Sequence, residues 1–441
     1  MTSRNVFLPD PFGVKPPLCR LVIAQNNSHN STMALSRYQF LRQSALAALG
    51  FAHTPDLMAQ ATAKPAVPTP GSVRKTVKIT DVKPYIFRNA LYAKIETDAG
   101  ISGWGEGDHE RPDFVGKFVS EVFAPILKGQ DPFDSEHLWT EMFFEGFENG
   151  STGLNPGAVA AVDNALWDLK GKLLGLPVSK LLGANKTEKV AVYGSYGRRK
   201  KDGYRTPLEM ANLGQEFVSQ GYKTIKARMQ LYDRERNPPF NFTYDCIKEV
   251  RKAVGDSTDI FVDFNNGYTA GKAIELGLKL YENFNIKVIE EPVSSMNYPD
   301  LRQVVEALPC EVNAGEHEYN KWQFRDLIMT GNPDCLNLDL IKCGGISECR
   351  KIAGMAHAFD KEVMVHNTRP TLATAASLNL VGSIANSAKV QEFSGLRPDL
   401  DQTVLFNGTV KFENGFLYIP TGVGLGLDVN EAEMEKRKLN K

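Results

Sequence analysis

Three carboxylic acids recur at nearly constant spacing in the second half of the chain. Asp263, Glu290 and Glu316 each end a short apolar run, and they are 27 and then 26 residues apart. If each step is one strand–helix unit of a β/α fold, three adjacent strands present three carboxylates to one point. Oxygen ligands without His or Cys suit Mg²⁺ and disfavour zinc. We therefore predict a Mg²⁺ site; the alternative is three unrelated carboxylates in exposed loops.

Two cationic residues lie close to the first of these acids in a strand order. Lys226 and Arg228 are two residues apart on a predicted strand, so both side chains point to the same side. If that side is the interior, Lys226 could pair with a substrate carboxylate or act as a base after its pKa is lowered. Arg228 stays protonated and would bind an oxyanion or carboxylate. The alternative is that both residues face helices or solvent.

An acid and a histidine follow with the same spacing. Asp339 and His366 are 27 residues apart and end neighbouring predicted strands. A carboxylate bonded to one ring nitrogen fixes the tautomer and raises basicity, which leaves the other nitrogen free for proton transfer. Glu392 ends the next strand and could bond a substrate oxygen or stabilise a developing enediolate. We predict that the Asp339–His366 pair carries out proton transfer.

The elements that must position these residues are short strands alternating with helices. Apolar runs begin near residues 190, 222, 259, 287, 310, 335, 362 and 389, each followed by a helical pattern. Eight such units predict a β/α barrel with its active site at the carboxyl ends of the strands. Before them, three strand-like runs and helical stretches indicate a small α+β domain. The predicted domains are residues 76–187 (α+β), 188–405 (barrel) and 406–441 (a segment returning to the first domain).

Bulk composition excludes several function classes. The 441 residues carry 51 Lys and Arg against 52 Asp and Glu, a formal net charge of -1. No basic field for nucleic acid and no polybasic membrane patch follows from that balance. The six cysteines form no CxxC pair, so neither a zinc site nor a disulfide framework is expected.

The first 75 residues have the character of an export signal and linker. A charged stretch at 36–42 (SRYQFLR) precedes a short apolar run at 44–52, and small residues and a Pro-rich linker follow. Tyr38 stands where a twin-arginine signal would have its second Arg. The run is too short to span a bilayer. We expect residues 1–75 to be disordered and to direct export to the periplasm; the alternative is a tail on a cytoplasmic enzyme.

From about residue 76 to 430 the chain resembles the mandelate racemase subgroup of the enolase superfamily, and most closely its galactonate-type sugar-acid dehydratases. The matching stretches are KIETDAGISGWGE (94–106), ALWDLKGKLLGLPVSKLLG (165–183), IEEPV (289–293), AGE (314–316) and CGGISECRKIAGMAHAFD (343–360). The resemblance implies an α+β capping domain on a modified (β/α)8 TIM-type barrel, frequently oligomeric. It also implies Mg²⁺ at Asp263, Glu290 and Glu316, a His366–Asp339 dyad, and Glu392 as the enolate-stabilising acid.

Two departures from that family concern the bases. The racemases carry Lys-x-Lys where this chain has Lys226 and Arg228. Galactonate dehydratases have a His two residues after the first metal ligand, where this chain has Asn265. The substrate face opposite His366 thus lacks both usual bases, which leaves Lys226 or a nearby Tyr as candidates. Because racemisation needs a base on each face, these departures argue against a racemase.

The expected function is Mg²⁺-dependent dehydration of an aldonate or aldarate sugar acid to a 2-keto-3-deoxy acid through an enediolate, catalysed by a hydro-lyase and a homo-oligomer. Alternatives are a cycloisomerase, epimerase or racemase of a sugar acid or another α-hydroxy acid, and a non-catalytic binding protein. The substrate contacts that we expect are Asn265, His317, His109, Arg369, Arg198 and the loops at 88–89 and 108–111.

Overall fold

The computed structural model describes residues 76–440, except 185, 201–202, 232–235, 239–240 and 396. The described residues belong to one compact unit, Arg74–Lys441. The predicted export signal and linker lie outside the described residues, and the predicted domain boundaries stay predictions. Within the described part of the chain, no helix is long and apolar enough to cross a membrane.

A small sheet and a helical layer form the first part of the unit. Strands β1 (Ile79–Phe87), β2 (Ala90–Thr97) and β3 (Ser102–Gly107) pair antiparallel in chain order. The helices that follow are α2 (Pro112–Lys117), η1 (Phe118–Phe123), α3 (Ala124–Leu127), α4 (Ser135–Glu145), η2 (Phe147–Asn149), α5 (Leu154–Leu174) and α6 (Val178–Leu181). Alternate glycines of β3 let α5 approach closely, because a Cβ at Gly105 would lie 2.3 Å from the Ala161 carbonyl oxygen.

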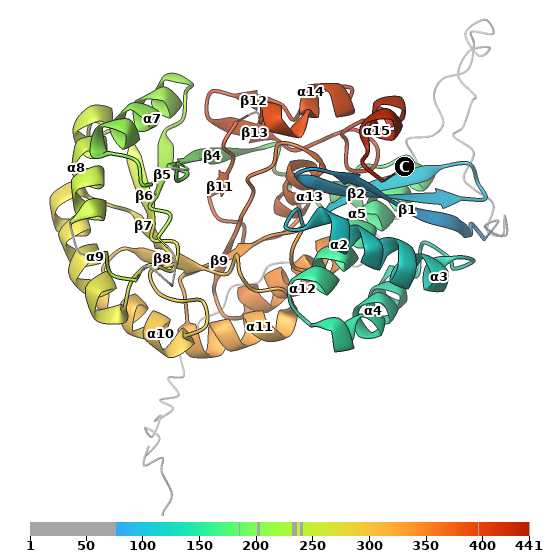
Figure 1. The fold of residues 1–441 in the computed structure, drawn as a ribbon, viewed down its shortest axis with the longest axis horizontal. Coiled ribbons are helices and arrows are strands. Elements are labelled where there is room, and N and C mark those ends of the chain that lie inside the picture. Colours follow the sequence, from blue (N-terminus) through green and yellow to red (C-terminus); the bar gives the residue numbers. More distant parts are fainter. Residues whose placement is uncertain are drawn as a thin grey trace, which may run out of the picture. The chain divides into compact units, whose positions relative to one another are not determined.

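Eight parallel strands form the barrel, as predicted (Figure 1). They are β4 (Lys189–Tyr196), β5 (Thr224–Arg228), β6 (Asp259–Asp263), β7 (Val288–Glu290), β8 (Glu311–Ala314), β9 (Cys335–Leu338), β10 (Glu362–Val365) and β11 (Val390–Glu392). Neighbours in the chain pair from β4 to β10, and β11 pairs with β4. The remaining join runs through a parallel bridge between Val363 and Ser387 and a bond from the Val365 N–H to Gln391 Oε1 of 2.8 Å. The ring is thereby closed.

Helices cover the outside of the ring after each of the first seven strands (Figure 1). They are α7 (Pro207–Ser219), α8 (Phe242–Val254), α9 (Ala270–Phe284), α10 (Tyr298–Ala307), α11 with η4 (Lys321–Asp326, Leu327–Gly331), α12 (Gly345–Ala358) and α13 (Leu372–Val381). Helix α7 begins with a capping box, in which Thr206 and Glu209 bond each other's backbone N–H, and with Pro207 at its first position.

The eighth strand differs from the sequence expectation of a following barrel helix. After β11 the described chain has only η5 (Pro398–Leu400) and the four-residue α14 (Gln402–Leu405). A hairpin of β12 (Phe412–Glu413) and β13 (Phe416–Tyr418) comes next, and β13 pairs antiparallel with β4. The hairpin therefore extends the sheet where a helix was expected.

The C-terminal segment then contacts the small sheet. Glu431, at the start of α15 (Glu431–Arg437), accepts a hydrogen bond of 2.9 Å from the indole N–H of Trp104 on β3. The Leu439 N–H donates to the Ile86 carbonyl on β1 at 2.7 Å. The segment thus contacts both the barrel and the first sheet.

The inward side chains of the barrel form two levels. The lower one, which we call the apolar layer, is a buried cluster of Tyr193, Phe261, Val288, Cys335, Met364 and Ala388. Two residues after Phe261, Val288 and Met364 come charged or titratable residues. We call this upper level the mouth cluster; its members are Lys226, Asp263, Glu290, Glu316, Asp339, His366 and Glu392, all buried. Since side chains two apart on a strand point to one side, both levels face inward.

Candidate active site

The three carboxylates predicted to hold a metal come together at the barrel mouth. Asp263 ends β6, Glu290 ends β7, and Glu316 follows β8 by two residues. One oxygen from each lies within 4.8 Å of the others. Glu290 Oε2 and Glu316 Oε2 are buried and have no hydrogen-bond partner among the described residues. Buried carboxylate oxygens without a partner are costly unless a cation binds them, so the three side chains fit Mg²⁺.

Asn265 orients the first of these carboxylates. Its backbone N–H donates to Asp263 Oδ1 at 2.8 Å and its side-chain amide donates to Asp263 Oδ2 at 2.9 Å. Its own Oδ1 accepts from the Gln230 N–H at 2.6 Å. Asn265 lines the cavity, as expected of a substrate contact, but these bonds commit its amide to the protein. The left-handed backbone at Asn265, with φ of 48°, makes this local loop possible.

Lys226 and Arg228 both point into the barrel, which rules out the alternative that they face helices or solvent. The Lys226 ammonium lies 2.5 Å from Glu290 and 3.5 Å from Glu392. Burial by itself would lower the pKa of Lys226, but Glu290 and Glu392 outweigh it and hold that pKa well above its usual value. Arg228 Nε lies 3.4 Å from Asp263 Oδ2. Both residues are therefore cations paired with the carboxylates, which suits neither to removing a proton.

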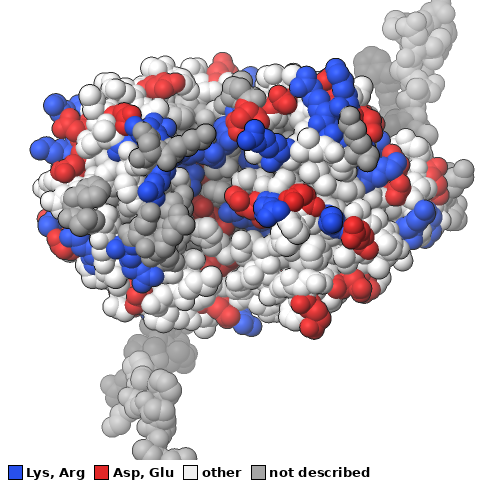
Figure 2. Space-filling view, viewed as in Figure 1, with Lys and Arg blue, Asp and Glu red and all other residues white. Residues whose placement is uncertain are grey.

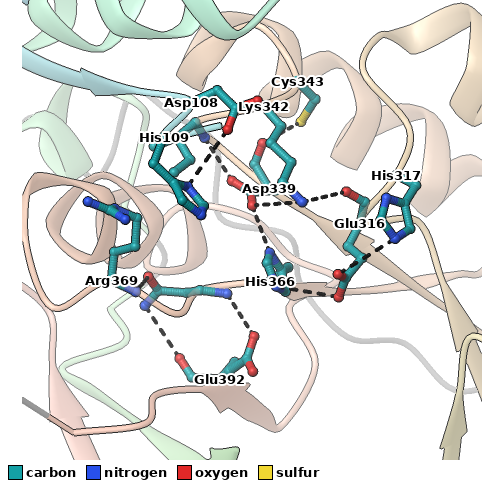
Figure 3. Close-up of polar contacts among 12 residues, drawn as sticks. Asp108, His109, Glu316, His317, Asp339, Lys342, Cys343, His366, Arg369 and Glu392 are labelled. Carbon is teal, nitrogen blue, oxygen red and sulfur yellow. Dashed lines mark hydrogen bonds and ion pairs between the residues drawn. The ribbon is translucent and has the colours of Figure 1, made fainter. Parts of the chain in front are cut away.

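The predicted dyad is assembled (Figure 3). His366 Nδ1 lies 2.7 Å from Asp339 Oδ2, and His366 Nε2 lies 3.4 Å from Glu316 Oε2. Asp339 is held in turn by the Ile341 N–H, which donates to Oδ1 at 2.9 Å. Burial opposes protonation of His366, but Glu316 and Asp339 outweigh it and raise the pKa of the imidazole. One ring nitrogen is thus fixed by Asp339 while the other faces the metal-binding carboxylates.

Glu392 completes the ring of charges beside Lys226. Its Oε1 approaches the Lys226 ammonium, and its Oε2 accepts a bond of 2.9 Å from the Asn367 N–H. Burial would raise the pKa of Glu392, but Lys226 and His366 outweigh it and lower that pKa. This carboxyl is therefore an anion at the far side of the mouth from Glu316.

Two residues of the site were missed in the sequence. Glu291, next to the second metal ligand, is 3% exposed, and burial followed by repulsion from Glu316 raises its pKa well above the usual value. The Lys342 ammonium donates to the Glu316 carbonyl at 3.2 Å and lies 3.8 Å from Asp339 Oδ2. The only signals were a second Glu at a strand end and a Lys three residues after Asp339.

The other expected substrate contacts also line the site, but their partners differ. Arg369 donates to Glu106 at 2.6 Å and to the Asn89 carbonyl at 2.6 Å, so it ties the barrel to the first sheet. His109, on the loop after β3, has a pKa lowered to about 3 by burial and by the charge of Arg369, which leaves its imidazole neutral. His317 Nε2 lies 3.2 Å from Glu291.

A cavity of about 990 Å³ opens above these groups. Figure 2 shows Lys and Arg side chains gathered around a hollow in this face of the molecule. The residues that line the cavity are Asn89, His109, Glu110, Arg198, Arg199, Arg228, Gln230, Asn265, Asn266, Glu291, Ser295, Glu316, His317, Lys342, His366, Thr368, Arg369, Arg397 and Asp399. A lining of charged and amide groups, with few apolar ones, suits a small polyhydroxylated anion.

Two family models match the chain. The one described as "Mandelate racemase / muconate lactonizing enzyme, N-terminal domain" matches residues 88–183. The one described as "Enolase C-terminal domain-like" matches residues 209–433. The matches span the small sheet with its helices and nearly all of the barrel.

Known proteins of similar sequence or structure agree with these matches. A D-galactonate dehydratase from Variovorax paradoxus is 32% identical over 368 residues, covering 80% of this chain and 93% of that protein. The 3,6-anhydro-D-galactonate cycloisomerase structure from Zobellia galactanivorans has a TM-score of 0.72 and 30% identity, over 82% of this chain and 99% of that one. A mandelate racemase/muconate lactonizing protein from Paracoccus denitrificans PD1222, complexed with magnesium, has a TM-score of 0.76 and 28% identity, over 82% and 97%.

Proposed function

Because this chain belongs to the mandelate racemase / muconate lactonizing enzyme family of enolase-like proteins, we propose that it is a Mg²⁺-dependent hydro-lyase. Its substrate is an aldonate or aldarate sugar acid, and its product is the 2-keto-3-deoxy acid. The observation that carries the proposal is the asymmetry of the mouth cluster. His366 offers one nitrogen for proton transfer on one side, while Lys226 and Arg228 on the other are paired cations.

Asp263, Glu290 and Glu316 would hold the metal ion, which stabilises the negative charge that develops on the substrate carboxylate when the α-proton leaves. Arg228 faces the same place and binds a carboxylate oxygen of the substrate. Lys226 keeps Glu290 and Glu392 in position. Residue types and distances here match what proton abstraction next to a carboxylate needs.

His366 carries out both proton transfers of a syn elimination. Its Nε2 takes the α-proton, and the electron pair of that C–H bond forms a carbon–carbon double bond as the β-carbon–oxygen bond breaks. The leaving hydroxide takes the proton back from His366 and departs as water. The resulting enol then becomes the 2-keto-3-deoxy acid. Asp339 supports both steps, because it bonds Nδ1 and stabilises the imidazolium.

The test is a screen of acid sugars with the purified protein and Mg²⁺, in which semicarbazide detects a 2-keto-3-deoxy product. We expect product from at least one sugar acid, its loss when the metal is chelated, and its loss in His366→Asn. The matched control is His357→Asn, an exposed histidine on α12. Full turnover by His366→Asn on every substrate that the wild type converts would overturn the proposal.

A cycloisomerase is the second candidate, favoured by the structural similarity to the 3,6-anhydro-D-galactonate cycloisomerase. Product analysis separates the two, since an isomerised acid keeps the mass of the substrate whereas dehydration removes one water. A non-catalytic binding protein would show no Mg²⁺-dependent exchange of the substrate α-proton with D₂O.

We also propose that the chain forms a homo-oligomer and that residues 1–75 direct its export. Light scattering of the purified protein tests the first point. Mass spectrometry of the mature chain from the natural cell, with its compartment determined by fractionation, tests the second. A monomer, or a full-length cytoplasmic chain, would contradict the respective proposal.

A further inference from the structure

We infer that the cavity binds a second anionic group of the substrate through Arg198, at the end remote from the three metal-binding carboxylates. The substrate class is then sugar acids with a charged terminus, either a second carboxylate or a phosphate ester. This inference rests on the proposed function and narrows its substrate.

Four arginines of the cavity wall differ in how their charge is offset. Arg228 faces Asp263 at 3.4 Å, and Arg369 donates to Glu106 at 2.6 Å. Arg397 forms a two-bond pair with Asp399, at 2.9 and 2.7 Å. For the Arg198 side chain, by contrast, the described residues provide no hydrogen bond or ion pair. The table of partners thus leaves one guanidinium on this wall free for an anion.

The position of Arg198 makes that vacancy unfavourable without a ligand. Burial lowers its pKa, and the positive charges of Arg397 and Arg228 lower it further. A guanidinium stays protonated in proteins, so this repulsion is a cost to the empty cavity and not a loss of charge. An anion placed between Arg198 and Arg397 would relieve the repulsion, and a guanidinium fork matches the geometry of a carboxylate or phosphate.

The topology sets the direction in which a substrate would extend. Arg198 follows β4 and Arg397 follows β11, and these two strands pair as neighbours. The metal-binding carboxylates follow β6, β7 and β8, and Arg228 on β5 lies between the two groups in strand order. A sugar acid whose reacting carboxylate lies at the carboxylates and Arg228 therefore extends its far end along the wall toward Arg198 and Arg397.

Binding to a non-reacting protein tests this without relying on turnover. In the His366→Asn background with Mg²⁺, calorimetry compares matched pairs that differ only at the terminal carbon: galactonate with galactarate, gluconate with glucarate, and gluconate with gluconate 6-phosphate. We expect at least one charged-terminus ligand to bind about tenfold tighter or more than its partner, as a new charge-assisted pair would give. Which pair shows the preference distinguishes carboxylate from phosphate.

Substitution of Arg198 assigns the preference. Adding Arg198→Gln should reduce the ratio of affinities within the pair to about one, while Arg198→Lys should keep part of it. Arg325→Gln, an exposed arginine on α11 paired with Asp326, is the control and should leave the ratio as it is. Equal affinities in every pair, or an Arg198→Gln variant that weakens both members equally, would overturn the inference.

The two proposals fail differently. If the wild type dehydrates only acids with an uncharged terminus, the subsite is wrong and the hydro-lyase stands. If a diacid or phosphate binds tightly through Arg198 but the wild type yields no 2-keto-3-deoxy acid from it or from any other sugar acid, the subsite stands and the hydro-lyase is wrong.

Discussion

The apolar layer and the mouth cluster are built on the same strands, two residues apart, yet they have opposite chemistry. Phe261 packs against Tyr193 with ring centroids 5.3 Å apart, while Asp263, on the same strand, belongs to the metal-binding set. One step of two residues, roughly 7 Å along a strand, separates packing from catalysis. The lower level supplies rigidity, and the upper level uses that rigidity to hold like charges together.

The mouth cluster is costly where the apolar layer is favourable. Its carboxylates are buried, two of its candidate ligand oxygens lack partners, and Glu291 beside it has a left-handed backbone with φ of 45°. Such features persist only when the surrounding structure enforces them. The comparison therefore predicts that substitutions in the upper level change activity, and that substitutions in the lower level change stability.

The largest effect should follow the loss of a metal ligand. Asp263→Asn removes one of three carboxylates, and a bound metal contributes several kcal/mol to the transition state, so kcat/KM should fall by about 10³-fold or more. Urea unfolding of the metal-free protein should change little, since the variant also removes a buried carboxylate from an acidic cluster. Activity within tenfold of the wild type would break the assignment of the mouth cluster to metal binding.

The next effect concerns the dyad. His366→Asn should lower kcat/KM by roughly 10³-fold, within the range for a positioned acid–base group, and Asp339→Asn by less, because Asp339 acts through the imidazole. Circular dichroism and the melting temperature should show both variants folded. If Asp339→Asn lost more activity than His366→Asn, the order of their roles would be wrong.

The apolar layer should respond in the opposite way. Phe261→Ala leaves a cavity beside Tyr193 and should lower the free energy of unfolding by about 3–5 kcal/mol. At a temperature where the variant is folded, kcat should stay within a few fold of the wild type. Phe359→Ala, at a side chain that is 46% exposed, is the control and should cost far less. A larger loss of activity than of stability in Phe261→Ala would blur the distinction between the two levels.

The smallest effect is the pH dependence of the metal-free protein. Burial, and repulsion from Asp263, raise the pKa of Glu290 to about 8 from its ordinary 4.5. A carboxyl whose folded pKa is raised stabilises the fold at low pH, and this contribution is lost as pH rises from about 4.5 through 8. The melting temperature without Mg²⁺ should therefore fall by a few degrees between pH 5 and 8.

Two comparisons isolate that effect. Glu290→Gln should flatten the slope, and saturating Mg²⁺ should abolish or reverse it, because the cation favours the ionised carboxylates. Thermal unfolding at fixed ionic strength across the range measures both. A metal-free melting temperature that rises with pH in this interval would contradict the assigned direction of the Glu290 shift.

Much of this architecture could be predicted from local patterns. Each barrel strand is a short apolar run that ends in a polar residue, and a nearly constant repeat length places successive strand ends side by side. That is why spacing was enough to bring Asp263, Glu290 and Glu316 together, and to place His366 beside Asp339. The missing helix after β11 was not foreseen, because the β12–β13 hairpin there is held by pairing with β4, about 220 residues earlier in the chain.

By itself the sequence determined the repeating strand–helix units, the order of the acids and the histidine along them, and therefore the class of chemistry, since these depend on neighbours within one unit. Only the tertiary structure decided how each charge is used. Lys226 is held as a cation because Glu290 and Glu392 meet it from distant strands. Arg369 is committed to Glu106, 263 residues away, whereas Arg198 is left for a ligand. Those outcomes depend on which side chains closure of the barrel brings within a few ångströms, and no local pattern carries that information.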